Sequence, residues 1–224
     1  MEAKRIKLSH SDSNLSSKAS SCGIAQAAEL SIELENEEKL KVFVKDLRRT
    51  LNNKQNIILF IKKRDVRFKI LVDQFVKMTN GLGSTSNNDP PAYLKEVTSL
   101  IANCCNYSVA ACLELKQPHL QFTFAAVKIL ESISAPMECK QSLIRMVANM
   151  CAHKETALFI SSSSGLIDKI SQFLENDNAE IIKQALRVLR LLSEASFTRV
   201  SLKLKKAFTA YLLKKGEYTK LEWA

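Results

Sequence analysis

The sequence predicts an all-α protein built from stacked helical repeats, and three observations support that fold class. First, the segment LIANCC at residues 100–105 returns 46 residues later as MVANMC at 146–151, and a third copy, VLRLLS, follows at 188–193. A period of about 40 to 47 residues is typical of helical solenoids. Second, glycine (5) and proline (4) are scarce in 224 residues, whereas β-rich folds need frequent turns. Third, apolar residues recur at helical spacing along most of the chain.

The N-terminal part of the chain divides into a tail and a set of helices. The first 28 residues are rich in serine and alanine and show no sustained apolar period, so a disordered tail is expected at 1–28. Residues 29–80 are expected to form N-terminal helices that act as a worn or capping repeat, with Asn36 and Asp65 as candidate N-caps. The run IILFI at 57–61 is ambiguous between a buried helix and a strand, and its helical surroundings favour a helix. The expected helices cover residues 37–52, 54–63 and 66–80.

A loop then leads into the repeat region. Residues 80–91 combine glycine, asparagine and proline in the pattern of a connecting loop. Its two glycines do not make a phosphate-binding loop, because no Gly-Lys-Ser/Thr follows them. The repeats are expected to run from 89 to 215, with a C-terminal tail at 216–224. Their helices are expected at residues 91–106, 108–115, 118–133, 136–151, 154–160, 166–175, 179–196 and 198–214.

Residues 146–193 resemble the armadillo repeat. The motif MVANMC at 146–151 resembles the end of the third helix of that repeat. The motif GLI at 165–167 is similar to the step into the second helix, and FLEND at 173–177 is similar to the turn that follows it. The resemblance implies that the all-α fold is an armadillo-like solenoid, a right-handed superhelix of helices.

The resemblance also implies a binding site for a partner protein. In peptide-binding armadillo proteins the asparagine of this motif lies in a concave groove and hydrogen-bonds an extended peptide, since its amide both donates and accepts. It therefore points to Asn103 and Asn149 as partner-binding residues. The alternative is that each asparagine binds a local backbone group inside the solenoid. The tryptophans that accompany the asparagine in nuclear import receptors have no counterpart here, because the single tryptophan is Trp223.

Short stretches within the same region are similar to a second, narrower family. They include SLIAN at 99–103 and RVLRL at 187–191, which are similar to the armadillo region of the heat-shock-factor-two-binding protein family. That family consists of meiotic adaptors for the recombination machinery, so the resemblance implies a role in a chromosome or recombination complex. The long N-terminal coiled coil of that family has no counterpart in this sequence.

The charge of the chain points to acidic partners. Its formal net charge is +10 and its pI is about 9.3. Lys183, Arg187 and Arg190 are spaced by four and three residues, so they form one stripe on a helix. Such a stripe would bind an acidic or amphipathic segment of another protein, and the competing hypothesis is that it binds the phosphates of DNA or RNA. A third interpretation is a solvated helix face that keeps the protein soluble.

The N-terminal tail contains a candidate nuclear import signal. The segment AKRIKL at residues 3–8 resembles the Myc-type signal, a small basic cluster flanked by aliphatic residues. Lys4, Arg5 and Lys7 would bind importin in an extended conformation. The sequence therefore predicts a nuclear protein, with a cytoplasmic one as the alternative.

Motifs for catalysis, cofactors and metals are not found. The chain contains no HExxH, GxSxG or P-loop pattern, so we expect a protein that is not an enzyme and holds no cofactor or metal. Cys151 and His153 could suggest a nucleophile and its base, but two residues apart they point to different faces. The cysteines have no Cys-x-x-Cys spacing and lie mostly among apolar residues, as in a reduced intracellular protein. Neither a membrane span nor a secretory signal is expected.

Overall fold

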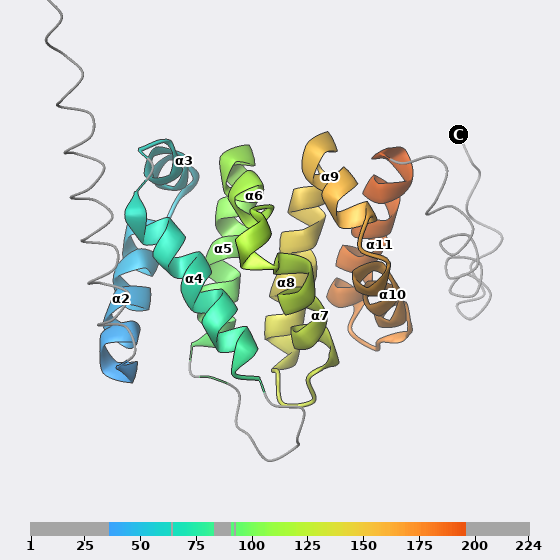
Figure 1. Ribbon diagram of the computed structural model, residues 1–224, viewed down its shortest axis with the longest axis horizontal. Helices are drawn as coiled ribbons and strands as arrows, with labels where there is room; N and C mark the ends of the chain where they lie inside the picture. Colours follow the sequence, from blue (N-terminus) through green and yellow to red (C-terminus); the bar gives the residue numbers. More distant parts are fainter. Residues whose placement is uncertain (1–35, 64, 83–90, 92, 196–224) are drawn as a thin grey trace, which may run out of the picture.

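The computed structural model describes residues 36–63, 65–82, 91 and 93–195, and its secondary structure in this part of the chain is entirely helical (Figure 1). The all-α prediction is confirmed there. The candidate import signal, most of the predicted loop and the helix expected at 198–214 lie outside the described residues.

Helices α2 to α11 and two short 3-10 helices, η1 and η2, follow one another along the chain. The first half comprises α2 (Glu37–Thr50), α3 (Lys54–Lys62), α4 (Val66–Asn80), α5 (Leu94–Tyr107), α6 (Val109–Leu115) and η1 (Pro118–Leu120). The second half comprises α7 (Phe122–Glu131), α8 (Met137–Cys151), α9 (Lys154–Ser161), α10 (Ser164–Gln172), η2 (Phe173–Glu175) and α11 (Ala179–Ala195).

The helices lie in three rows (Figure 1). Helix α5 packs along α8 and α8 along α11, with α2 beside α5 at the end of this row. Helices α4, α7 and α10 form a second row, in which α7 packs against both neighbours. The short helices α3, α6 and α9 lie along the upper edge of Figure 1. Three consecutive helices thus contribute one member to each row, and this set occurs as α3–α5, α6–α8 and α9–α11.

The predicted caps are present at the starts of the N-terminal helices. Asn36 Oδ1 accepts a hydrogen bond from the backbone N–H of Glu38 (2.9 Å), and Asp65 Oδ1 accepts one from that of Arg67 (3.0 Å). Each bond satisfies a backbone donor that the helix itself leaves free. The ambiguous run at 57–61 is helical, as predicted, and lies within α3.

The helix expected at 166 begins two residues earlier, at Ser164. Two other predicted starts lie three or four residues too early, each because of a residue with positive φ. The helix expected at 91 begins at Leu94, since Tyr93 has a φ of 65°. The helix expected to run from 118 begins as η1, and α7 starts only after Gln121, whose φ is 46°. A residue in the left-handed region cannot continue a right-handed helix. Neither residue is a glycine or an asparagine, so the usual sequence signal for this conformation is missing.

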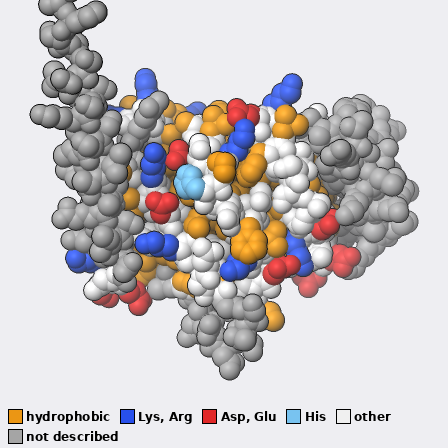
Figure 2. All heavy atoms as spheres, viewed as in Figure 1, with side chains coloured by type: hydrophobic (Ala, Val, Ile, Leu, Met, Phe, Trp, Pro, Cys, Tyr) orange, Lys and Arg blue, Asp and Glu red, His pale blue; other side chains and the backbone are white. Residues whose placement is uncertain are grey.

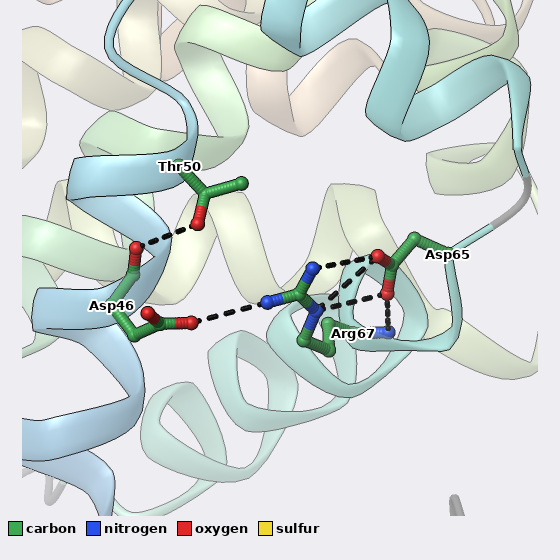
Figure 3. Close-up of polar contacts among 4 residues, drawn as sticks. All are labelled: Asp46, Thr50, Asp65 and Arg67. Carbon is green, nitrogen blue, oxygen red and sulfur yellow. Dashed lines mark hydrogen bonds and ion pairs between the residues drawn. The ribbon is translucent and has the colours of Figure 1, made fainter.

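Helix α2 is tied to the rest by an arginine that binds two carboxylates (Figure 3). Arg67 lies at the start of α4, where its Nη2 is 2.8 Å from Asp65 Oδ2 and its Nη1 is 3.1 Å from Asp46 Oδ2 on α2. Burial alone would raise the pKa of Asp65, but the hydrogen bonds from Arg67 outweigh it and hold that pKa below its ordinary value. Arg67 also lies over the ring of Phe60, 5.6 Å from its centroid.

The core is continuous from α2 to α11, and α8 is its most deeply buried helix. From Met146 to Cys151 every residue of α8 is buried. The five cysteines of the described part are free and buried. Burial raises the pKa of both Cys104 and Cys151 to about 12, so these thiols stay protonated at neutral pH. No helix among the described residues is both long and apolar enough to span a membrane.

Candidate functional site

The residues predicted to bind a partner lie on α5, α8 and α11, the third helices of the three sets. We call the surface formed by Ser99, Asn103, Arg145 and Arg187 the third-helix face. Ser99, Arg145 and Arg187 each stand directly before one copy of the repeated six-residue motif, so they occupy equivalent places in successive sets. All four residues are half-buried.

Arg145 lies in the middle of this face and lacks an acidic partner. Its Nη2 donates a long hydrogen bond to Ser99 Oγ (3.4 Å), which joins α8 to α5. Its Nε is buried and has no hydrogen-bond acceptor among the described residues. Arg145 also makes no ion pair within the part of the chain that the structure describes. A half-buried guanidinium without a carboxylate is an unsatisfied charge.

Glu180 on α11 is an acidic group whose pKa is affected by the charge of Arg145. The pKa of Glu180 lies below its ordinary value, mainly because Gln184 Nε2 donates a hydrogen bond to Oε1 (2.8 Å), with smaller contributions from the charges of Lys183 and Arg145. Glu180 is therefore already engaged by its own helix. Its charge reaches Arg145 only from a distance and forms no ion pair with it.

The predicted basic stripe on α11 divides into two kinds of cation. Lys183 Nζ lies 3.5 Å from Glu180 Oε2, and Arg190 Nη1 lies 3.3 Å from Glu194 Oε1, so each is paired one turn along its own helix. Arg187 makes no ion pair within the described residues. Its charge acts on buried Cys151, where it works against the rise in pKa that burial causes. Of the three predicted cations, only Arg187 is free of a carboxylate in this part of the chain.

The two predicted asparagines are not equivalent in the structure. Asn103 is half-buried on the third-helix face, whereas Asn149 is only 3% exposed. Asn149 Nδ2 donates to the backbone oxygen of Ala102 (3.1 Å), and its Oδ1 is buried without a donor among the described residues. Asn149 thus takes the local role that the sequence left as an alternative, because it holds α8 to the backbone of α5.

The sequence motifs do not point to Arg145, although it lies on this face. The armadillo pattern points to the asparagine four residues later, and the predicted basic stripe lies on α11. The signal was nevertheless in the sequence, since Arg145 stands 42 residues before Arg187 at the same point of the repeat.

The described residues contain no group of three or more His, Cys, Asp or Glu side chains that could hold a metal ion. The Cys151 thiol is protonated at neutral pH because burial raises its pKa to about 12. It is therefore a poor nucleophile for its neighbour His153 to activate.

Comparison with known proteins identifies a similar fold and no family. No protein-family model matches the chain, and no curated protein matches it. A crystal structure described as that of an engineered protein is similar, with a TM-score of 0.59 and 19% sequence identity. The match covers 87% of this chain and 73% of the engineered one. At that level of identity it supports the helical fold alone.

Proposed function

We propose that this protein is an armadillo-like solenoid that serves as a non-enzymatic adaptor in the nucleus. The third-helix face would hold an acidic segment of a partner protein, as in a chromosome or recombination complex. The observation that carries the proposal is the pair Arg145 and Arg187, which are half-buried, equivalent in successive sets and unpaired within the described residues.

The solenoid part of the proposal is supported by the packing of the helices. The three sets place their third helices in one row through direct contacts of α5 with α8 and of α8 with α11. Stacking each set only on its neighbours gives a molecule whose side chains recur along one extended face. Such a face suits an elongated partner segment better than it suits a small molecule.

The chemistry of the two arginines favours an acidic partner segment. A guanidinium presents a planar fork of donors that matches a carboxylate, and a hydrogen bond to a charged group contributes about 1.5–3 kcal/mol. The carboxylates of α11 are already engaged, since Glu180 binds Gln184 and Lys183, and Glu194 binds Arg190. A partner carboxylate would therefore supply what the chain does not. Asn103, on α5 of the same third-helix face, would hydrogen-bond the backbone of the partner segment.

The test measures binding of a fluorescein-labelled peptide of 15 residues rich in Glu and Asp by fluorescence anisotropy. We expect R145E/R187E to weaken binding at least about tenfold. Each arginine is replaced by a glutamate, whose negative charge would repel the carboxylates of the peptide. The matched control is R48E/R49E, which makes the same change of charge at exposed positions of α2. Equal weakening by both variants would show unspecific attraction to net charge and would contradict the proposal.

Nucleic acid is the second candidate, favoured by the net charge of +10. A 20-nucleotide DNA or RNA competitor should bind with an affinity that falls steeply as salt rises, because phosphate binding releases counterions. If such an oligonucleotide displaces the peptide at physiological salt and its binding depends on Arg145 and Arg187, the face binds phosphates.

The nuclear part of the proposal rests on the N-terminal tail. Replacing Lys4 and Arg5 with alanine in a fluorescent fusion should abolish nuclear accumulation. Unchanged accumulation would remove the import signal from the proposal and leave the third-helix face unaffected.

A further inference from the structure

Exposed aliphatic and aromatic side chains gather along the edge formed by the short helices. The described residues contain nine large hydrophobic side chains that are exposed, and five of them lie on α3, on α9 or where α5 meets α6. We call these five the first-helix edge: Ile58, Leu59, Tyr107, Val109 and Leu158. Their exposed fractions lie between 37% and 51%. Single exposed apolar residues are ordinary, but a concentration on one edge indicates an interaction surface.

Two contacts link neighbouring helices along this edge. Lys54 Nζ of α3 lies 6.0 Å from the centroid of the Tyr107 ring at the end of α5. Lys116 Nζ, just after α6, lies 2.6 Å from Glu155 Oε1 on α9. Figure 2 shows hydrophobic side chains along the upper edge of the molecule, where Figure 1 places α3, α6 and α9.

Helix α3 carries more apolar residues than it buries against the core of this chain. The run at 57–61 buries Ile57, Phe60 and Ile61 in the core. Ile58 and Leu59 belong to the same run and face outward, where an isolated amphipathic helix would carry polar residues. The helix is therefore apolar on both faces, which is typical of a helix that has a packing partner on each face.

The charges along the edge are predominantly positive. Helix α3 has no acidic residue, and Lys54 and Lys62 are exposed at its two ends, followed by exposed Lys63. Lys154 is exposed at the start of α9. The acid of α9, Glu155, is neutralised by Lys116. A second copy of this edge would therefore be repelled, whereas an acidic partner would be attracted.

We propose that the first-helix edge binds an amphipathic helix of another protein, aliphatic on one face and acidic on its flanks. Packed helices lie about 8–10 Å apart, and seven residues of helix rise about 10.5 Å. A partner helix lying across the row would thus present an aliphatic residue to each successive short helix at a spacing of seven residues. Leu59, Val109 and Leu158 would receive these residues, and Lys62, Lys63 and Lys154 would face the acidic flanks.

The test is a selection of random 16-residue peptides, displayed on phage, against the wild-type protein. Synthetic copies of the enriched peptides are then measured on L59E/L158E and on the matched control V42E/F124E. The control replaces two hydrophobic residues of similar exposure, 66% and 55%, that lie outside the edge. All four positions are exposed, so circular dichroism should show both variants folded.

We expect enriched peptides with apolar residues at helical spacing and a net negative charge. Their affinity should fall at least about tenfold in L59E/L158E and stay within about twofold of wild type in the control. Enriched peptides without the helical pattern or without an acidic excess would overturn the proposal, as would equal affinity for the two variants. Binding of phosphatidylserine vesicles through the edge, with no peptide dependent on it, would identify a membrane surface and would equally overturn it.

Discussion

The start of α4 and the middle of α8 each hold a half-buried arginine, and the two differ in what surrounds them. Arg67 is bound by Asp65 and Asp46 at distances of 2.8 and 3.1 Å, and these contacts join α4 to α2. Arg145 makes one long hydrogen bond to Ser99. It forms no ion pair with a carboxylate of the described residues, and its Nε has no acceptor there. The first arrangement completes a structural contact inside the chain. The second leaves a guanidinium without an ion-pair partner among the described residues, and this is the ground for the binding site proposed above.

The largest effect on stability is expected at the paired arginine. In Arg67→Ala, Asp65 and Asp46 lose their partner, and the contact with Phe60 is lost as well. We expect the free energy of unfolding to fall by about 2 kcal/mol, because a partly buried carboxylate is left without its cation. Urea unfolding followed by circular dichroism measures this. A change of less than about 0.5 kcal/mol, as at an exposed arginine such as Arg48, would show that the contact is not structural.

A somewhat smaller loss is expected at the bond that joins α5 to α8. Asn149→Ala removes the hydrogen bond to the Ala102 oxygen and leaves a small cavity. We expect a loss of about 1–2 kcal/mol of unfolding free energy. The matched variant is Asn103→Ala, which should change stability by less than about 0.5 kcal/mol, because Asn103 is half-buried and makes no side-chain hydrogen bond to another helix among the described residues. Equal losses would contradict the different positions of the two asparagines.

At the unpaired arginine the expected sign is reversed. Arg145→Met keeps the packing of the stem and removes a charge that has no carboxylate among the described residues. We expect stability to be unchanged or to rise by up to about 1 kcal/mol, while binding of the acidic peptide falls. A loss of stability comparable to that of Arg67→Ala would show that Arg145 is structural, and the contrast between the two arginines would disappear.

The comparison also shows what the sequence could predict. The caps at Asn36 and Asp65 and the helix through 57–61 follow from local patterns, and the structure confirms them. The pairing of Arg67 with Asp46 joins residues 21 positions apart on two helices, and no local pattern indicates it. The burial of Asn149 against α5 depends in the same way on how closely two third helices approach. The presence of these helices was therefore predictable, although the starts after Tyr93 and Gln121 were not. The partner of each polar side chain was set by packing.

Acid should weaken the ion pair of Asp65 with Arg67 near the N-terminus. The pKa of Asp65 is lower in the folded chain than the unfolded value of about 3.9. Its carboxylate therefore contributes stability above about pH 4, and this contribution is lost as the pH falls through the lower, folded-state pKa. Asp65→Asn should flatten this part of the pH dependence of Tm between pH 5 and 2, by differential scanning fluorimetry. A slope that persists in the variant would assign it to other acids.

The smallest effects are expected where cations are paired on the surface of α11. Lys183→Ala and Arg190→Ala remove exposed ion pairs within one helix, and such pairs contribute about 0.5 kcal/mol or less. Each variant also leaves an acid, Glu180 or Glu194, without its neighbouring cation beside the third-helix face. That acid would repel an acidic segment, so peptide affinity should fall modestly, by about twofold, although stability hardly changes. A loss as large as the roughly tenfold one expected of R145E/R187E would place the binding energy in the whole stripe and remove the distinction between paired and unpaired cations.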